Sequence, residues 1–186
     1  MPSISDARIL IISDNGFEQS ELEVPRDQLR ARGATVHVAT PDGKPVRGWD
    51  GGDWGREAEA DLSLDDVEMA DYDALVLPGG QINPDLLRVN PTAVGIIRAA
   101  AEMGRIIAAI CHAPWLLIEA GLAEGREMTS YHSIRTDLKN AGAKVVDAEV
   151  AISNGIITSR SPEDLDAFVA KIVEEVEEGR HPRDAA

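Results

Sequence analysis

Short apolar runs recur along the chain and predict strands that are buried in the centre of the fold. Residues 8–13, 74–77 and 106–110 are almost continuously apolar, and residues 35–40 form a further candidate strand. Runs of this length are typical of parallel strands that are covered on both faces. The pattern therefore predicts a mostly parallel central sheet.

Segments with helical periodicity lie between these strands, and several of them end at a glycine, a common helix terminator. The segments that we expect to be helical are 20–32, 64–70, 91–103, 114–120 and 134–140, with a last helix that opens at 161–164. Ser161 is expected to cap that last helix, with Asp164 in a capping-box position. The alternation of strands and helices predicts a doubly wound α/β sandwich.

A hairpin is expected late in the chain. Residues 150–153 and 156–159 are both strand-like, and they flank the dipeptide Asn154-Gly155. This dipeptide is the strongest short signal for a tight two-residue turn between antiparallel strands. The late segment therefore predicts a β-hairpin attached to the otherwise parallel sheet.

Residues 41–61 interrupt the alternation, because they hold two prolines and five glycines among charged residues. We expect an irregular excursion or a small hairpin there. Trp49 and Trp54 are expected to pack at the base of this segment rather than to bind a ligand.

Length and charge narrow the class of protein. The 186 residues suit one domain over residues 1–186, with residues 179–186 as a frayed tail. The net charge of −15 argues against binding to nucleic acid or to an anionic membrane. No signal peptide is visible, and no apolar run approaches the roughly 20 residues of a membrane span. With a single cysteine, which excludes an internal disulfide, these features predict a cytoplasmic protein.

The single cysteine, Cys111, lies where a buried strand meets a predicted turn. His112 follows it directly, and Pro114 marks the start of the next helix. The positive end of a helix lowers the pKa of a nearby thiol, and the thiolate is the reactive form. The alternative is an inert cysteine buried in the core. The adjacent histidine and proline favour a nucleophile.

Three other groups are candidate partners of the thiol. His112 can act as a base or as an imidazolium ion that stabilises a thiolate. The backbone N–H of His112 can donate to an oxyanion, with Gly80 as the opposing donor. Glu18 follows the first strand, and beside a buried thiol its carboxyl would have a raised pKa and donate to the sulfur.

Metal and cofactor sites are not expected. No pair of histidines has metal-ligand spacing on one helix, and the glycine pair Gly79-Gly80 is not followed by the residues of a phosphate-binding loop. His37 is assigned to a strand and His181 to the tail. His132 is the remaining candidate for the wall of the pocket.

Taken together, these motifs resemble the PfpI family, which belongs to the class I glutamine amidotransferase-like superfamily. The matching stretches are GFEQSEL at 16–22, DALVLPGG at 73–80, AICHAPW at 109–115, TSYHSIRTDL at 129–138 and ITSRSPEDL at 157–165. They follow the order of the family through nearly the whole chain.

The resemblance implies a flavodoxin-like three-layer sandwich with Cys111 as a nucleophile on a strained turn. It assigns Glu18 to the glutamate that contacts the sulfur and Tyr131 to a pocket tyrosine. It also places Gly80 and the amide of His112 in an oxyanion hole. Two departures are visible, because Ala113 stands where the family usually has glycine and His132 where it usually has proline.

The resemblance further implies a homo-oligomer, a dimer or a larger assembly. In the protease members, a glutamate of a neighbouring subunit orients the histidine. Here Asp85 is the substitute, in a loop over residues 81–85 that is one residue longer.

The leading hypothesis is a cysteine-dependent hydrolase of the PfpI type, an intracellular peptidase related to stress, which takes a peptide as substrate and needs no cofactor. A second hypothesis is a glyoxalase or deglycase that acts on a small reactive carbonyl such as methylglyoxal or its protein adducts. A third is a stress protein without enzymatic activity, in which Cys111 senses oxidants.

Overall fold

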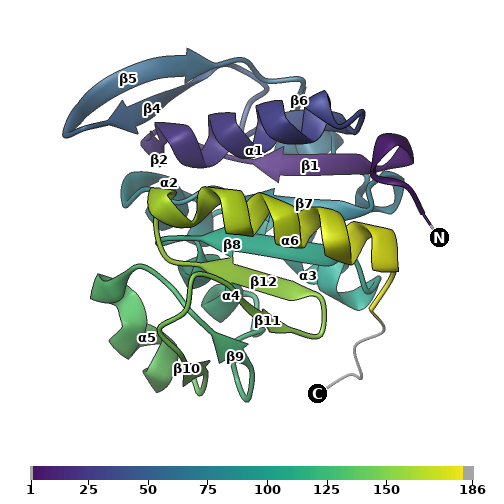
Figure 1. Ribbon diagram of the computed structural model, residues 1–186. Helices are drawn as coiled ribbons and strands as arrows, with labels where there is room; N and C mark the ends of the chain where they lie inside the picture. Colours follow the sequence, from purple (N-terminus) through teal and green to yellow (C-terminus); the bar gives the residue numbers. More distant parts are fainter. Residues whose placement is uncertain (1, 182–186) are drawn as a thin grey trace.

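A seven-stranded sheet forms the centre of the molecule, with helices on both of its faces (Figure 1). The computed structural model describes residues 2–181. In spatial order the strands are β11 (Ala151–Ser153), β12 (Ile156–Ser159), β8 (Ile106–Ile110), β7 (Ala74–Leu77), β1 (Arg8–Ile12), β3 (Thr35–Thr40) and β6 (Leu62–Ser63). All neighbouring pairs are parallel except β11 and β12. The sheet confirms the predicted mostly parallel, flavodoxin-like sandwich.

Helices from distant parts of the chain cover the two faces. Helices α1 (Gln19–Ala31) and α6 (Leu165–Glu178) pack side by side on one face. The buried residues of α3 (Pro91–Glu102) and α4 (Pro114–Glu119) join a separate apolar cluster on the other face. The remaining α-helices are α2 (Ile82–Arg88), which contacts α3 and α4, and α5 (Arg135–Asn140), which contacts α4.

Strand β1 shows why the central strands are apolar at every position. Leu10 and Ile12 belong to the cluster under α3 and α4, whereas Ile9 and Ile11 belong to the cluster under α1 and α6. All four side chains are fully buried. Because both faces of the sheet are covered, neither set of alternating positions can be polar.

Two small sheets accompany the main one. Strands β2 (Phe17–Glu18), β4 (Val46–Asp50) and β5 (Asp53–Ala58) form the first, and β9 (Glu127–Met128) and β10 (Lys144–Val145) form the second. The antiparallel pair β4–β5 is therefore the small hairpin expected in the segment from 41 to 61.

The late hairpin is confirmed. Strands β11 and β12 pair antiparallel around Asn154 and Gly155, whose φ angles are 49° and 74°. Positive φ at both central positions is the geometry of a type I′ turn, which glycine and asparagine tolerate best.

Three expectations about helices were wrong. The helix predicted over 64–70 is two short 3₁₀-helices, because the intervening Val67 is extended. The loop predicted over 81–85 is the first turn of α2, where Pro84 is tolerated because first-turn N–H groups lack helical partners. The hydroxyl of Ser161 lies 2.5 Å from the carboxylate of Glu163 and does not cap a backbone N–H, and the last α-helix begins at Leu165.

The structure follows the expected tail as far as His181, whose amide donates to the carbonyl of Gly104. Residues 182–186 of that tail lie outside the described residues. Among the helices of residues 2–181, none combines the length and the apolar character that a membrane span requires.

Removing the ring of Phe168 tests the packing of α6 on the sheet. Phe168 is fully buried, so Phe168→Ala should lower the free energy of unfolding by about 3–5 kcal/mol through lost burial and cavity formation. Urea denaturation measures the change. Met103→Ala is the control, because Met103 is 42% exposed and should lose less than about 1 kcal/mol. Equal losses for the two variants would contradict the assignment.

Candidate active site

The carboxyl ends of the parallel strands meet at one edge of the sheet, where ligands bind in folds of this kind. A cavity of about 640 Å³ opens there beside Cys111. Its walls are formed by Glu18, Glu21, Trp49, Gly80, Gln81, Cys111, His112, Tyr131, His132, Ser133, Ser161, Pro162 and Glu163. The cavity thus gathers residues from the ends of several elements that are distant in the chain.

Cys111 occupies a strained turn between β8 and α4. Its φ angle is 65°, in the left-handed region that residues with a Cβ atom rarely adopt. The Cys111 amide donates to the carbonyl of Ser159 at 3.0 Å, and its carbonyl accepts from the amide of Tyr131 at 2.9 Å. Both sides of the turn are therefore anchored, which matches the elbow that the family resemblance implies.

His112 contacts the sulfur directly, although the two residues are adjacent in the chain. Its Nδ1 atom lies 3.1 Å from the Sγ atom of Cys111, and its Nε2 atom lies 3.3 Å from the hydroxyl of Ser133. The ring stacks on Tyr131, with 4.7 Å between the ring centroids. Tyr131 in turn packs against the ring of His132. These contacts fix the imidazole with one nitrogen facing the thiol.

Two backbone amides point at the sulfur, which is the arrangement that an oxyanion hole requires. The amides of Gly80 and His112 both interact with Cys111 and lower the pKa of its thiol. Gly80 has a φ angle of 81°, and a Cβ atom there would collide with the backbone of residues 16–18. The buried side-chain amide of Asn83 holds the loop through two hydrogen bonds. Its NH₂ group donates to the backbone carbonyl of Pro78 at 3.0 Å, and its oxygen accepts from the backbone N–H of Asp14 at 2.7 Å. Only glycine fits at position 80, and Asn83 holds the loop around it.

Glu21, not Glu18, is the carboxyl group beside the thiol. Glu21 is fully buried, its Oε2 atom accepts from the amide of Gly79 at 2.9 Å, and it interacts with Cys111. Glu18 lies in the extended segment before α1, and its partly buried side chain is on the cavity wall. The assignment of Glu18 to the sulfur contact was therefore wrong. A signal was available, because Glu21 shares the buried face of α1 with Leu22 and Leu29.

Burial keeps the Glu21 carboxyl protonated near neutral pH. Desolvation is the main cause that raises its pKa to about 8, and the negative charge of Glu18 adds to it. The pKa of Glu18 is also raised, mainly by burial and then by the negative charge of Asp50. The Oε1 atom of Glu21 has no hydrogen-bond partner within the described chain. A protonated Glu21 is thus available to donate to the sulfur or to a bound substrate.

The resting thiol is protonated, which differs from the sequence-based expectation. Burial, followed by the charge of Glu21, raises the pKa of Cys111 by more than the two amides lower it. Helix α4 begins only at Pro114 and is six residues long, so its dipole contributes little. Burial and His132 lower the pKa of His112, whose imidazole is therefore neutral. The site can work by transfer of the thiol proton to His112 as general base.

Asp85 and Trp49 are placed differently from the expectations. Asp85 is exposed on α2 and does not line the cavity, so within one chain it does not orient His112. The hydroxyl of Ser133 contacts the imidazole instead, a contact that no sequence motif indicated. Trp49 packs edge to face on Trp54, as a hairpin partner would, but it also forms part of the cavity wall.

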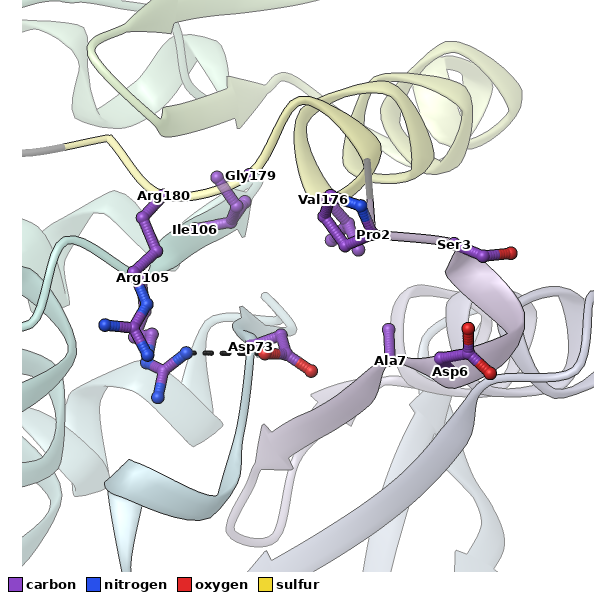
Figure 2. A pocket seen from close by; sticks show the side chains of 10 residues that line it. All are labelled: Pro2, Ser3, Asp6, Ala7, Asp73, Arg105, Ile106, Val176, Gly179 and Arg180. Atoms are coloured by element: carbon purple, nitrogen blue, oxygen red, sulfur yellow. Dashed lines mark hydrogen bonds and ion pairs between the residues drawn. The ribbon is translucent and has the colours of Figure 1, made fainter.

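A second cavity, of about 440 Å³, lies at the amino ends of the strands and holds none of the predicted site residues (Figure 2). Arg105 and Asp73 form an ion pair on its wall. Strand amino ends rarely carry catalysis in such folds, so the cavity beside Cys111 is the candidate active site. Within residues 2–181, one group of three side chains has the types and spacing to ligate a metal, Glu175, Glu178 and His181, and it lies outside this cavity.

Comparison with known proteins gives matches over most of the chain. The model of the DJ-1/PfpI family matches residues 7–175. Deglycase TK1284 of Thermococcus kodakarensis is 42% identical over 166 residues, which cover 89% of this chain and 97% of the relative. YraA of Bacillus subtilis, which bears a provisional cysteine-protease name, is 39% identical over 162 residues. These residues cover 87% of this chain and 93% of the relative. The structure of DJ-1beta of Drosophila melanogaster superposes with a TM-score of 0.82 at 32% identity, covering 93% of this chain and 95% of that one.

Glu21→Gln tests the ionisation of the buried carboxyl. In the unfolded chain the glutamate ionises near its ordinary pKa of 4.5, but in the folded chain near 8. Between these values only the folded state holds the proton, so its stability falls as the pH rises. Relative to Glu21→Gln, the parent should lose about 1.4 kcal/mol of unfolding free energy per pH unit. Denaturant titrations at several pH values from about 5 to about 8 measure this. A difference that stays constant with pH would contradict the raised pKa.

Proposed function

Because the chain belongs to the DJ-1/PfpI family, we propose that it is a cysteine-dependent deglycase that acts on small reactive carbonyls and their adducts on amines. The observation that carries the proposal is the joint placement of Cys111, His112 and Glu21 at one cavity. The thiol supplies a nucleophile, the imidazole a base, and the carboxyl a second proton carrier. The name of the Thermococcus relative supports the same reaction class.

Access to the thiol favours a small substrate. Cys111 is 6% exposed, and the stacked rings of His112 and Tyr131 line the cavity beside it. An aldehyde, or the end of a modified side chain, reaches such a thiol more readily than an extended main chain does. This burial is the reason that we place the deglycase ahead of the peptidase.

The first step is addition of the thiol to the carbonyl carbon. A bond forms between the sulfur and the carbon, and the thiol proton passes to Nδ1 of His112. The electron pair of the C=O bond moves to the oxygen, which accepts hydrogen bonds from the amides of Gly80 and His112. Transfer of the proton from His112 to this oxygen gives a hemithioacetal. With an amine adduct, cleavage of its C–N bond releases the amine before this addition.

The second step moves a proton between neighbouring carbons. With methylglyoxal, the ionised form of Glu21 takes the proton from the carbon bonded to sulfur, and an enediolate forms. The hydroxyl proton on that carbon passes to the oxygen of the adjacent carbon, and Glu21 returns its proton to the adjacent carbon itself. The product is a thioester, so no external oxidant is needed. Water then cleaves the C–S bond, which releases lactate and regenerates the thiol. A pKa of about 8 suits a group that must both donate and accept protons.

A peptidase remains the second candidate, and the protease name of YraA favours it. The same thiol would attack a peptide carbonyl, and His112 would return the proton to the leaving amine. A redox sensor is the third candidate, because a carboxyl beside a thiol also suits oxidation of the sulfur.

A homo-oligomer is part of the proposal. Helix α2 exposes apolar side chains, with Ile82 38% and Leu86 40% exposed, and Val89 after its end is 79% exposed. Such a stripe is suited to burial against a second copy of the chain. Asp85 lies on the same helix, so a neighbouring subunit's Asp85 could reach the site only through such an assembly.

Ser133→Ala and Asp85→Ala separate two ways of orienting His112. If Ser133 positions the imidazole, its loss should lower kcat several-fold, because one hydrogen bond to the ring is removed. The alkaline limb of the pH–rate profile should shift as well, while KM changes little. Asp85→Ala should be neutral unless a subunit contact orients the ring. An unchanged kcat in Ser133→Ala, together with a lowered kcat in Asp85→Ala, would assign the role to the neighbouring subunit.

Turnover assays with Cys111→Ala test the proposed reaction. The protein should consume free methylglyoxal, and it should remove the methylglyoxal adduct from a modified peptide. The rates of both reactions should fall at least about 1,000-fold in Cys111→Ala. An unmodified, unstructured peptide is the parallel substrate. Cleavage of that peptide alone would favour the peptidase. Failure on all substrates, together with peroxide modification of Cys111, would favour the redox sensor.

A further inference from the structure

The C-terminal end of α6 carries a charged residue in a position that should be apolar. Buried side chains of α6 recur at helical spacing through Phe168, Val169, Ile172 and Val176, and Glu175 falls on the same face. Glu175 is only 4% exposed. A carboxyl group at such a position is costly unless a partner compensates for its lost hydration.

His181 is the side chain that meets Glu175. The Nε2 atom of His181 lies 3.0 Å from the Oε2 atom of Glu175, which is within ion-pair distance. Both atoms are buried, yet neither has a hydrogen-bond partner within residues 2–181. At this separation an N–H that pointed at the oxygen would form a hydrogen bond. The oxygen therefore lies off the axis along which the ring nitrogen donates a proton or a lone pair.

This arrangement fits two ligands that share a cation. Ligand atoms that each lie about 2.1 Å from one metal ion, at angles of about 90° to 110°, are about 3.0 to 3.4 Å apart. Each atom then lies well off the lone-pair axis of the other. Glu178 adds a third ligand one helical turn along, and the three ligand atoms lie within 4.8 Å of one another.

We propose that Glu175, Glu178 and His181 bind a divalent transition-metal ion of the zinc class. One imidazole nitrogen and two carboxylates form a mixed ligand set that suits zinc and its neighbours, whereas calcium prefers oxygen ligands alone. Glu178 is exposed, so its side chain can rotate to close the site.

The charges around the site also favour a cation. Glu174 and Glu178 lie within one turn of Glu175 on α6 and add negative charge there. Lys171, one helical turn earlier, is paired with Glu174 at 2.8 Å. A divalent ion would supply the positive charge that the buried carboxylate lacks.

Metal binding would also fix the end of the chain to the sheet. The amide of His181 donates to the carbonyl of Gly104, two residues before β8. Gly179 and Arg180, which lie between the ligands, form one wall of the second cavity (Figure 2). An ion at this position would therefore tie α6, the segment after it and the start of β8 together.

Zinc titration of a tag-free, chelator-treated Cys111→Ala protein tests the proposal, since this background removes the thiol of the active site as a ligand. Calorimetry should show one zinc ion per chain, and the melting temperature should rise with zinc. His181→Ala and Glu175→Gln in this background should weaken zinc binding at least tenfold and abolish the rise. CaCl₂ should produce neither effect.

Glu174→Gln is the matched control, because it removes the same charge from the same helical turn outside the cluster. It should bind zinc like its parent. Melting curves recorded with a chelator establish that each variant is folded. Unchanged zinc affinity in His181→Ala, or no zinc binding by the parent, would overturn the proposal. A His181→Ala protein that is less stable without metal, from a parent that zinc does not stabilise, would show a simple ion pair instead.

Discussion

The left-handed backbone at Cys111 is the constraint on which the site depends. A φ angle of 65° at a residue with a side chain is unfavourable, so neighbouring structure must hold it. The carbonyl of Ser159 and the amide of Tyr131 do so from two later segments. The turn directs the sulfur into the cavity, and it lets the ring of the very next residue approach that sulfur. A relaxed turn would place these two side chains on opposite sides.

The polar groups at this turn are matched through their protonation states. A buried thiolate and a buried carboxylate would repel each other, and burial makes the charged form of the thiol, the carboxyl and the imidazole costly. Desolvation instead favours the neutral form of each, so Cys111 and Glu21 rest protonated and His112 rests as a neutral imidazole. The site is therefore stable without substrate and generates charge only where the backbone amides can stabilise it.

Local sequence signals predicted those features whose causes are local. The apolar central strands, the Asn154-Gly155 turn and the glycine at position 80 each follow from backbone requirements that one short stretch reveals. Glu21 was missed because its role depends on which face of α1 is buried, and Glu18 is the carboxyl nearer to the strand. Ser133 was missed because a serine hydroxyl gives no signal until the fold brings it to His112.

The anchoring of the nucleophile also sets when it can exist during synthesis. The amide of Cys111 is held by the carbonyl of Ser159, which belongs to β12 and leaves the ribosome well after β8. Until β12 docks beside β8, the turn lacks one of its two anchors, and nothing holds the histidine ring against the sulfur. A partly made chain therefore carries an ordinary cysteine, and the reactive arrangement arises only when nearly the whole sheet is complete.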